Sequence, residues 1–393
     1  MTIQSTFGSF AATLSRNPLP WALVAGITAK ATQIAICSFF RASPRLISLM
    51  ARASHVSGGS ALVNYGPSLL IALATGVLLH YCSPSIKPTI SAAEPQEPFV
   101  YETIHARVDH QIQEDALKEG RSLITVYRGE CRTAYTCSNY PKRLVEAHTI
   151  FCDAFGYAHN DLVQVAAIAD GCGVGEASQR AARFMVDHFM YNMQSCQGPA
   201  EKCVMGVVKR SQDEIEATKE NKVRLYGKTT FLGGLIFTAT NGKRYFTGVN
   251  CGDCKLYHLN NGKFVELTKP SRTDMRDSGG NFGPNRKNRD KTEYTFTCEV
   301  QPGDKLIFMT DGVHDNLDSN PSRDSTLAQP EETDHRKLST LHRLPQTGEI
   351  GSNIMDYVFK YTEPLLTAME NNLDPKNIPG KPDHMTLLVV QVR

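Results

Sequence analysis

Apolar residues form short runs and alternating stretches through most of the chain after about residue 122. Residues 162–169 are apolar enough for a buried strand, and apolar positions recur at helical spacing after the glycine-rich turn that follows. Residues 305–310 form a second apolar strand, and residues 385–392 form the last one. The pattern therefore predicts strands joined by turns, with helices at a few places.

Two Asn-Gly turns, at 241–242 and 261–262, separate alternating segments, which is a strong signal for antiparallel hairpins. Further strands are expected at 122–127, 147–151, 229–240, 244–250, 255–259, 264–267 and 294–300. Helices are expected at 101–119, after residue 175, at 201–219 and at 354–369, and loops at 271–291 and 316–353. These elements predict an α+β fold, an antiparallel β-sandwich flanked by helices on both faces (αββα).

The first 82 residues form a separate hydrophobic region. Residues 21–40 and 61–82 are each long enough to cross a bilayer, which takes about 20 residues. Lys30 weakens the first segment, since a central lysine costs about 2.5–3.5 kcal/mol on insertion. A membrane hairpin, an acid-poor organelle-targeting presequence and a buried hydrophobic hairpin remain alternatives. Residues 83–121 are expected to be a proline-rich linker and a lead-in helix, and residues 122–393 the main domain.

Composition excludes some classes of function. Lys and Arg number 42 and Asp and Glu 40, so the net charge of +2 gives no field that attracts nucleic acid. The eleven cysteines show no paired framework, and they indicate free thiols in a reducing compartment. We therefore expect the main domain to lie in such a compartment, attached to a membrane through residues 21–82 or sent to an organelle by a presequence.

Three predicted strands carry an aspartate at one end. Asp170 and Asp311 each follow an apolar strand and precede a glycine, and Asp383 stands just before the last strand. A carboxylate at the end of a buried strand is rigidly held but faces open space. Oxygen ligands of this kind favour hard cations such as Mg²⁺ and Mn²⁺. An isolated Asp-Gly is more often a simple turn, so the case for a site depends on the three occurring together.

Four motifs extend this pattern: Ile-Ala-Asp-Gly-Cys-Gly at 168–173, Val-Asn-Cys-Gly-Asp at 249–253, the segment from Pro302 to Asp315, and Asp-His-Met-Thr at 383–386. In this order they resemble the motifs of the metal-dependent (PPM, type 2C) protein serine/threonine phosphatases. The resemblance covers about residues 122–393. It implies hydrolysis of phosphoserine and phosphothreonine in phosphoprotein substrates, by a water molecule activated between two divalent cations.

The resemblance also implies a set of ligands. Asp170 and Asp311 would bridge or flank two Mg²⁺ or Mn²⁺ ions, the carbonyl of Gly171 would be a further ligand, and Asp383 would complete one ion. The acidic pair that holds a third, weaker ion in the family matches Asp253 and Asp315. Two divalent ions about 3.5–4 Å apart are suited to in-line phosphoryl transfer.

The sequence departs from the family pattern in two places. Cys172 replaces a histidine that protonates the leaving group, and we consider Cys172 and, as a substitute, His314 for that role. The upstream Arg and Glu-Asp motif is degraded. In one alignment of this motif, Arg143 would bind phosphate and Glu146 would contact the water shell of a metal ion. In the other alignment, residues 152–155 form the motif.

These departures leave a second hypothesis open, in which the domain is a catalytically weak or silent phosphatase-like binding or scaffold module. Retention of the aspartates favours the enzyme. The C-x-x-C at 251–254 suggests redox or zinc chemistry less strongly, because no second C-x-x-C pair accompanies it.

Overall fold

The computed structural model describes residues 88–90, 100–104, 125–138, 140–141, 144, 150–218, 225–269, 272, 277–284, 293–318, 330–345, 348–374 and 378–393. The chain divides into two compact units, Met1–Ile86 and Lys87–Arg393. All described residues belong to the second unit, so the predicted hydrophobic segments 21–40 and 61–82 lie outside them. Among the helices of the described part, none has the length and apolar character needed to cross a bilayer.

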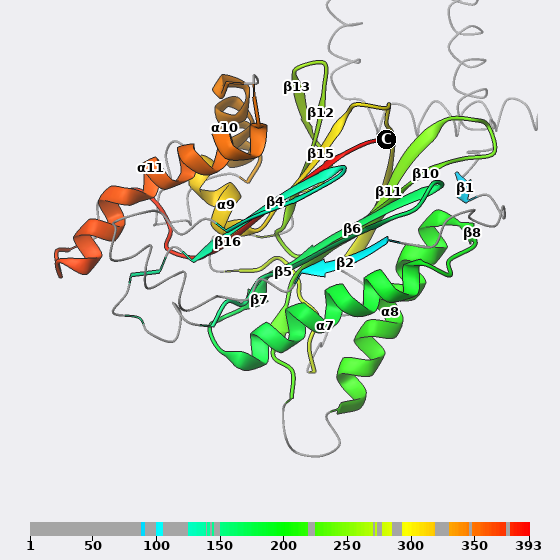
Figure 1. Ribbon diagram of the computed structural model, residues 1–393. Helices are drawn as coiled ribbons and strands as arrows, with labels where there is room; N and C mark the ends of the chain where they lie inside the picture. Colours follow the sequence, from blue (N-terminus) through cyan, green and yellow to red (C-terminus); the bar gives the residue numbers. More distant parts are fainter. Residues whose placement is uncertain are drawn as a thin grey trace, which may run out of the picture. The chain divides into compact units, whose positions relative to one another are not determined.

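Two six-stranded antiparallel sheets form the centre of the fold (Figure 1). The first has the order β14-β11-β10-β6-β5-β2 and the second the order β13-β12-β15-β16-β4-β3. The first sheet comprises β2 (Val100–Ile104), β5 (Ala154–His159), β6 (Val163–Ala169), β10 (Phe231–Thr238), β11 (Arg244–Cys251) and β14 (Glu293–Glu299). The second comprises β3 (Thr125–Gly129), β4 (Arg132–Ser138), β12 (Lys255–Asn260), β13 (Lys263–Glu266), β15 (Lys305–Met309) and β16 (His384–Gln391). Two short pairs, β1 (Thr89–Ile90) with β8 (Gly198–Pro199) and β7 (Gly171–Cys172) with β9 (Lys228–Thr229), complete the strands.

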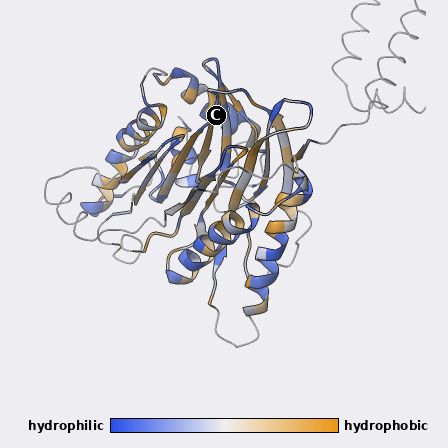
Figure 2. Ribbon diagram, turned by 45° about the vertical axis from the view of Figure 1, so that its right-hand side comes forward, coloured by the Kyte–Doolittle hydropathy of each residue, from blue (hydrophilic) through white to orange (hydrophobic). Residues whose placement is uncertain are grey.

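The central strands are buried on both faces, which explains their continuous apolar sequence. In β6, Ala166 and Ile168 pack toward the other sheet, whereas the alternate residues Val165 and Ala167 pack toward the helices. The core between the sheets also contains Phe246 and aliphatic residues of β15 and β16. Figure 2 shows the strands as mostly hydrophobic, while the helices carry both colours. The helices are therefore amphipathic covers over the sheets.

Helices α7 (Glu176–Met193) and α8 (Ala200–Ala217) cover the first sheet, and both lie on one side of the sandwich in Figure 1. The opposite side carries α9 (Asp311–His314), the 3-10 turn η3 (Asp315–Leu317), α10 (Pro330–Arg343) and α11 (Ile350–Glu370). The αββα architecture expected from the sequence is thus confirmed.

Several predicted elements are confirmed and three are wrong. The helices at 201–219 and 354–369, the meander from residue 229 and the last strand are found with small shifts of their ends. The helix expected at 101–119 is wrong in its described part, because Val100–Ile104 pairs with β5 as a strand. The loop expected at 316–353 contains α10. The strand expected at 147–151 begins only at Ala154, and β4 was not predicted because its sequence is rich in polar residues.

Candidate metal centre

Asp170 lies at the end of β6, where its main chain is tied to the neighbouring strand. The Asp170 carbonyl accepts hydrogen bonds from the Thr230 amide, at 2.8 Å, and from the Thr229 hydroxyl, at 2.8 Å. The Thr230 hydroxyl accepts a bond from the Asp170 amide at 3.2 Å. This carboxylate is therefore presented from a rigid sheet edge, as the apolar run and its aspartate predicted.

Asp253 and Asp311 approach Asp170 from the other parts of the sandwich. Asp253 stands in the turn between β11 and β12, where the chain passes from the first sheet to the second, and Asp311 is the first residue of α9, directly after β15. One carboxylate oxygen from each of the three residues lies within 4.8 Å of the other two. Residues that are far apart in the sequence thus form one cluster.

Close backbone approach explains the glycines that follow two of the aspartates. A Cβ at position 312 would lie 2.0 Å from the carbonyl oxygen of His384, and one at position 171 would lie 2.7 Å from the carbonyl oxygen of Ser178. No side chain fits at such distances. The Asp-Gly pairs therefore bring neighbouring segments close to the carboxylates, in addition to turning the chain.

The three carboxylates suit a divalent cation. Of the residues that the structure describes, Asp253 Oδ1 and Asp311 Oδ1 are buried oxygens without a hydrogen-bond partner, and these side chains are only 5% and 11% exposed. A buried charged oxygen without a partner is costly. A divalent cation would satisfy both atoms together, so the residues present fit the Mg²⁺ or Mn²⁺ ion expected from the sequence.

Asp383 lies beside this cluster and is paired with Lys381. The Lys381 ammonium contacts Asp311 Oδ2, lies 2.7 Å from Asp383 Oδ2 and 3.6 Å from Asp315 Oδ2. Asp383 Oδ1 accepts hydrogen bonds from the Tyr140 hydroxyl at 3.1 Å and from the His384 amide at 2.9 Å. Both oxygens of Asp383 therefore have partners within the protein.

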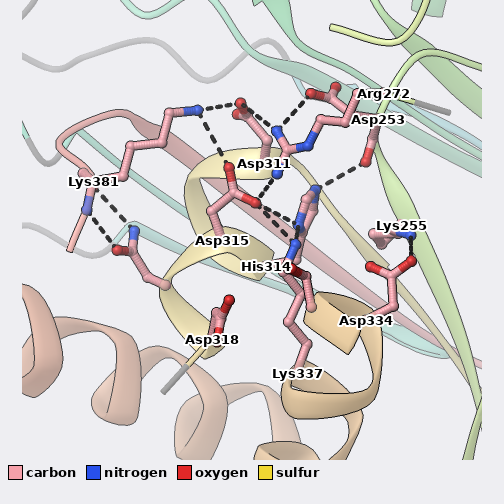
Figure 3. A network of polar contacts seen from close by, with 12 residues as sticks. Asp253, Lys255, Arg272, Asp311, His314, Asp315, Asp318, Asp334, Lys337 and Lys381 are labelled. Carbon is pink, nitrogen blue, oxygen red and sulfur yellow. Dashed lines mark hydrogen bonds and ion pairs between the residues drawn. The ribbon is translucent and has the colours of Figure 1, made fainter. Parts of the chain in front are cut away.

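Arg272 reaches the cluster from the opposite side, as Figure 3 shows. Its guanidinium lies 3.0 Å from Asp253 Oδ2 and 3.9 Å from Asp311 Oδ2, and it also contacts Asp315 Oδ1. The ammonium of Lys337, on α10, lies 2.9 Å from the same Asp315 oxygen. Asp315 is thus surrounded by cationic side chains, whereas Asp253 and Asp311 each keep one oxygen for an ion.

The pKa values follow this division. Burial and the neighbouring Asp311 raise the pKa of Asp170 well above its ordinary value, and the same two causes raise that of Asp253 to about 7. Burial acts on Asp311 and Asp315 too, but Lys381 lowers the pKa of Asp311, and Arg272 with Lys337 holds that of Asp315 well below the usual range. Burial and neighbouring carboxylates therefore disfavour the charged form of Asp170 and Asp253, whereas nearby cations favour the charged form of Asp311 and Asp315.

A cavity of about 180 Å³ opens onto the carboxylates. Its lining includes five aspartates and a single ammonium group. The lining residues are Tyr140, Asp170, Gly171, Cys172, Gly173, Asp253, Asp277, Ser278, Asp311, Lys381, Asp383 and His384.

The two candidates for the proton donor differ in position. Cys172 lines the cavity, and burial raises the pKa of its thiol to about 12. His314 is fully buried, its Nε2 lies 2.9 Å from the Asp253 carbonyl oxygen and its Nδ1 lies 2.9 Å from the Lys337 ammonium. Burial lowers the pKa of His314 to about 4. His314 is therefore buried beneath the site and is not among the residues that line the cavity, whereas Cys172 is.

Asp153 belongs to the second alignment of the upstream motif, residues 152–155. Asp153 is buried, accepts a hydrogen bond from the Thr310 hydroxyl at 3.0 Å, and its pKa is raised to about 8 by burial and by Asp383. Arg143 and Glu146 lie outside the described residues. No sequence pattern pointed to Arg272 or Lys381, although Lys381 stands two positions before Asp383.

Comparison with known proteins gives the family. Residues 147–340 match the family model described as protein phosphatase 2C. A search of curated protein sequences found no match. Among solved structures, RsbX in complex with magnesium is 16% identical, with a TM-score of 0.41, covering 69% of this chain and 100% of RsbX.

Two further structures are similar to this extent. The serine/threonine phosphatase PstP/Ppp of Mycobacterium tuberculosis is 17% identical with a TM-score of 0.42, covering 68% of this chain and 100% of its own. The serine/threonine phosphatase Stp1 of Staphylococcus aureus is 16% identical with a TM-score of 0.45, covering 68% and 98%. On the family match over residues 147–340, the chain carries a domain of the protein phosphatase 2C family.

Proposed function

We propose that this protein hydrolyses phosphoserine and phosphothreonine in phosphoprotein substrates, with Mg²⁺ or Mn²⁺ as the required cation. The observation that supports this most directly is the convergence of Asp170, Asp253 and Asp311 on one cavity, with two buried oxygens free to bind an ion. The family match supports the same class of reaction.

The charge of the cavity explains why a cation is needed. Five aspartates and one lysine line it, so a phosphate monoester would be repelled if no cation were bound there. A divalent ion bound by these carboxylates would supply positive charge for the phosphoryl group and a water molecule of lowered pKa. Asp170, Asp253 and Asp311 would hold the ion, and Gly171 lines the same cavity.

An assay of the full-length chain in detergent tests this function. With Mn²⁺ and a phosphothreonine peptide we expect release of inorganic phosphate, and we expect EDTA to abolish it and added Mn²⁺ to restore it. Activity that persists in excess EDTA would contradict the proposed metal dependence.

Cys172 predicts a preference among leaving groups. Because its thiol is a weak acid, protonation of an alkoxide is poorly assisted, whereas an aryl oxide needs little help. In Cys172→His we expect phosphopeptide turnover to rise while aryl phosphate turnover stays similar, so that the ratio of aryl phosphate to phosphopeptide turnover falls. General acid catalysis contributes about 10²–10⁴-fold to a reaction that needs it. The matched control is Cys172→Ala, which should leave the ratio high. A ratio that is the same in all three proteins would show that residue 172 does not protonate the leaving group.

The silent binding module remains the second candidate, because Lys381 and Arg272 already contact the carboxylates. A chain that binds Mn²⁺ and a phosphopeptide but releases no phosphate would favour this alternative over the enzyme.

A further inference from the structure

Lys381 lies where the family resemblance leads one to expect a second divalent ion. Its ammonium touches Asp311 Oδ2 and lies 2.7 Å from Asp383 Oδ2, so a positive charge already bridges these carboxylates. The distance from the same ammonium to Asp315 Oδ2 is 3.6 Å. A single cationic side chain thus contacts three of the aspartates assigned to metal binding.

The main chain of Lys381 is tied to the helix that carries Asp311. Asn316, which is 1% exposed, accepts a hydrogen bond from the Lys381 amide at 2.8 Å and donates to the Lys381 carbonyl at 3.1 Å. The same Asn316 amide group donates to the Gly312 carbonyl at 2.7 Å. The origin of the lysine side chain is therefore fixed relative to Asp311, which an ordinary surface ion pair would not require.

The oxygens of the cluster divide into two sets. Asp311 Oδ1 and Asp253 Oδ1 have no hydrogen-bond partner among the described residues, and they share the three-aspartate cluster with Asp170. Asp311 Oδ2 and Asp383 Oδ2 instead face Lys381, and Asp383 Oδ1 is taken by Tyr140 and His384. The geometry fits one divalent ion beside one ammonium group.

We propose that the Lys381 ammonium takes the place of the second metal ion, so that the protein binds one divalent ion tightly and a second only after Lys381 is displaced. This inference rests on the proposed metal dependence of the site. It makes residue 381 a determinant of metal stoichiometry, and it predicts that the charge of residue 381 decides how many ions are bound.

The test is a Mn²⁺ titration of the full-length protein by calorimetry, with ion counting by native mass spectrometry. We expect one tight ion in the wild type and two in Lys381→Met, with the second ion bound roughly tenfold more tightly or better than in the wild type, because a cation beside a carboxylate changes its affinity for a competing cation by about 10-fold or more. Lys381→Arg, which keeps the charge, should bind one. Lys243→Met, which removes a lysine paired with Glu299 at a distant exposed site, should also bind one.

Further arms separate the possible failures. In Lys381→Met, adding Asp383→Asn should remove the second ion and leave the first. Two ions bound by the wild type with the affinities of Lys381→Met would overturn the inference while supporting metal dependence. If neither the wild type nor Lys381→Met binds Mn²⁺, both this inference and the proposed metal dependence are overturned. Circular dichroism checks the folding of each variant. If Lys381→Met does not fold, the number of Mn²⁺ ions bound by the wild type decides. Two tightly bound ions contradict the inference, and a single one agrees with it.

Discussion

Replacing Asp311 by asparagine is expected to lower both Mn²⁺ affinity and phosphopeptide hydrolysis by more than about 100-fold. Loss of a residue that only orients a metal ligand typically costs 10- to 100-fold, and Asp311 supplies a carboxylate to the cluster itself. An amide of the same shape keeps the packing but removes the charge that binds the ion. Titration calorimetry and phosphate release measure the two effects.

The control for this substitution is Asp356→Asn, which changes an exposed aspartate on α11. It should retain wild-type affinity and activity. Thermal melting of both variants separates loss of the ion from loss of the fold. Wild-type turnover in a folded Asp311→Asn protein would refute the proposed role of the carboxylate cluster.

Replacing Asp315 by asparagine is expected to destabilise the fold by about 3–5 kcal/mol, the usual cost of breaking a buried ion pair. Asp315 is 1% exposed and contacts Arg272, Lys337 and His314. Asparagine would leave Lys337, which is itself buried, without a carboxylate partner. Urea unfolding with EDTA present measures this cost without a contribution from bound metal.

The comparison is with an exposed ion pair on α10, the helix that carries Lys337. Glu332 pairs with Arg336 at 2.9 Å but is 67% exposed, and such pairs contribute about 0–1 kcal/mol. Glu332→Gln should therefore change stability little. Equal effects of the two substitutions would mean that the Asp315 network is not a significant source of stability.

The sequence predicted the two-sheet architecture and the aspartates for a physical reason. Strands buried on both faces must be apolar throughout, and this makes runs such as residues 163–169 easy to recognise. The aspartate that ends such a run stands out against it. Asp170, Asp253 and Asp311 were identified in this way or from the family motifs, and the structure brings them together.

The features that the sequence did not predict, β4, α10 and the basic residues of the site, depend on contacts between distant parts of the chain. Strand β4 contains arginine and threonine residues although it lies between β16 and β3, and α10 is mostly polar although its Lys337 is buried against Asp315. Lys337 and Arg272 could not be recognised from the sequence, since an isolated basic residue in a polar segment is normally solvated. Their role follows only from the long-range placement of Asp315.

The passage of the chain between sheets at Asp253 has a mechanical consequence. Asp170 follows a strand of one sheet and Asp311 follows a strand of the other, so a cation bound by both would cross-link the two layers. The free energy of metal binding would then add to the stability of the sandwich against unfolding. Metal supply would in this way set the rigidity of the whole scaffold as well as the chemistry at its edge.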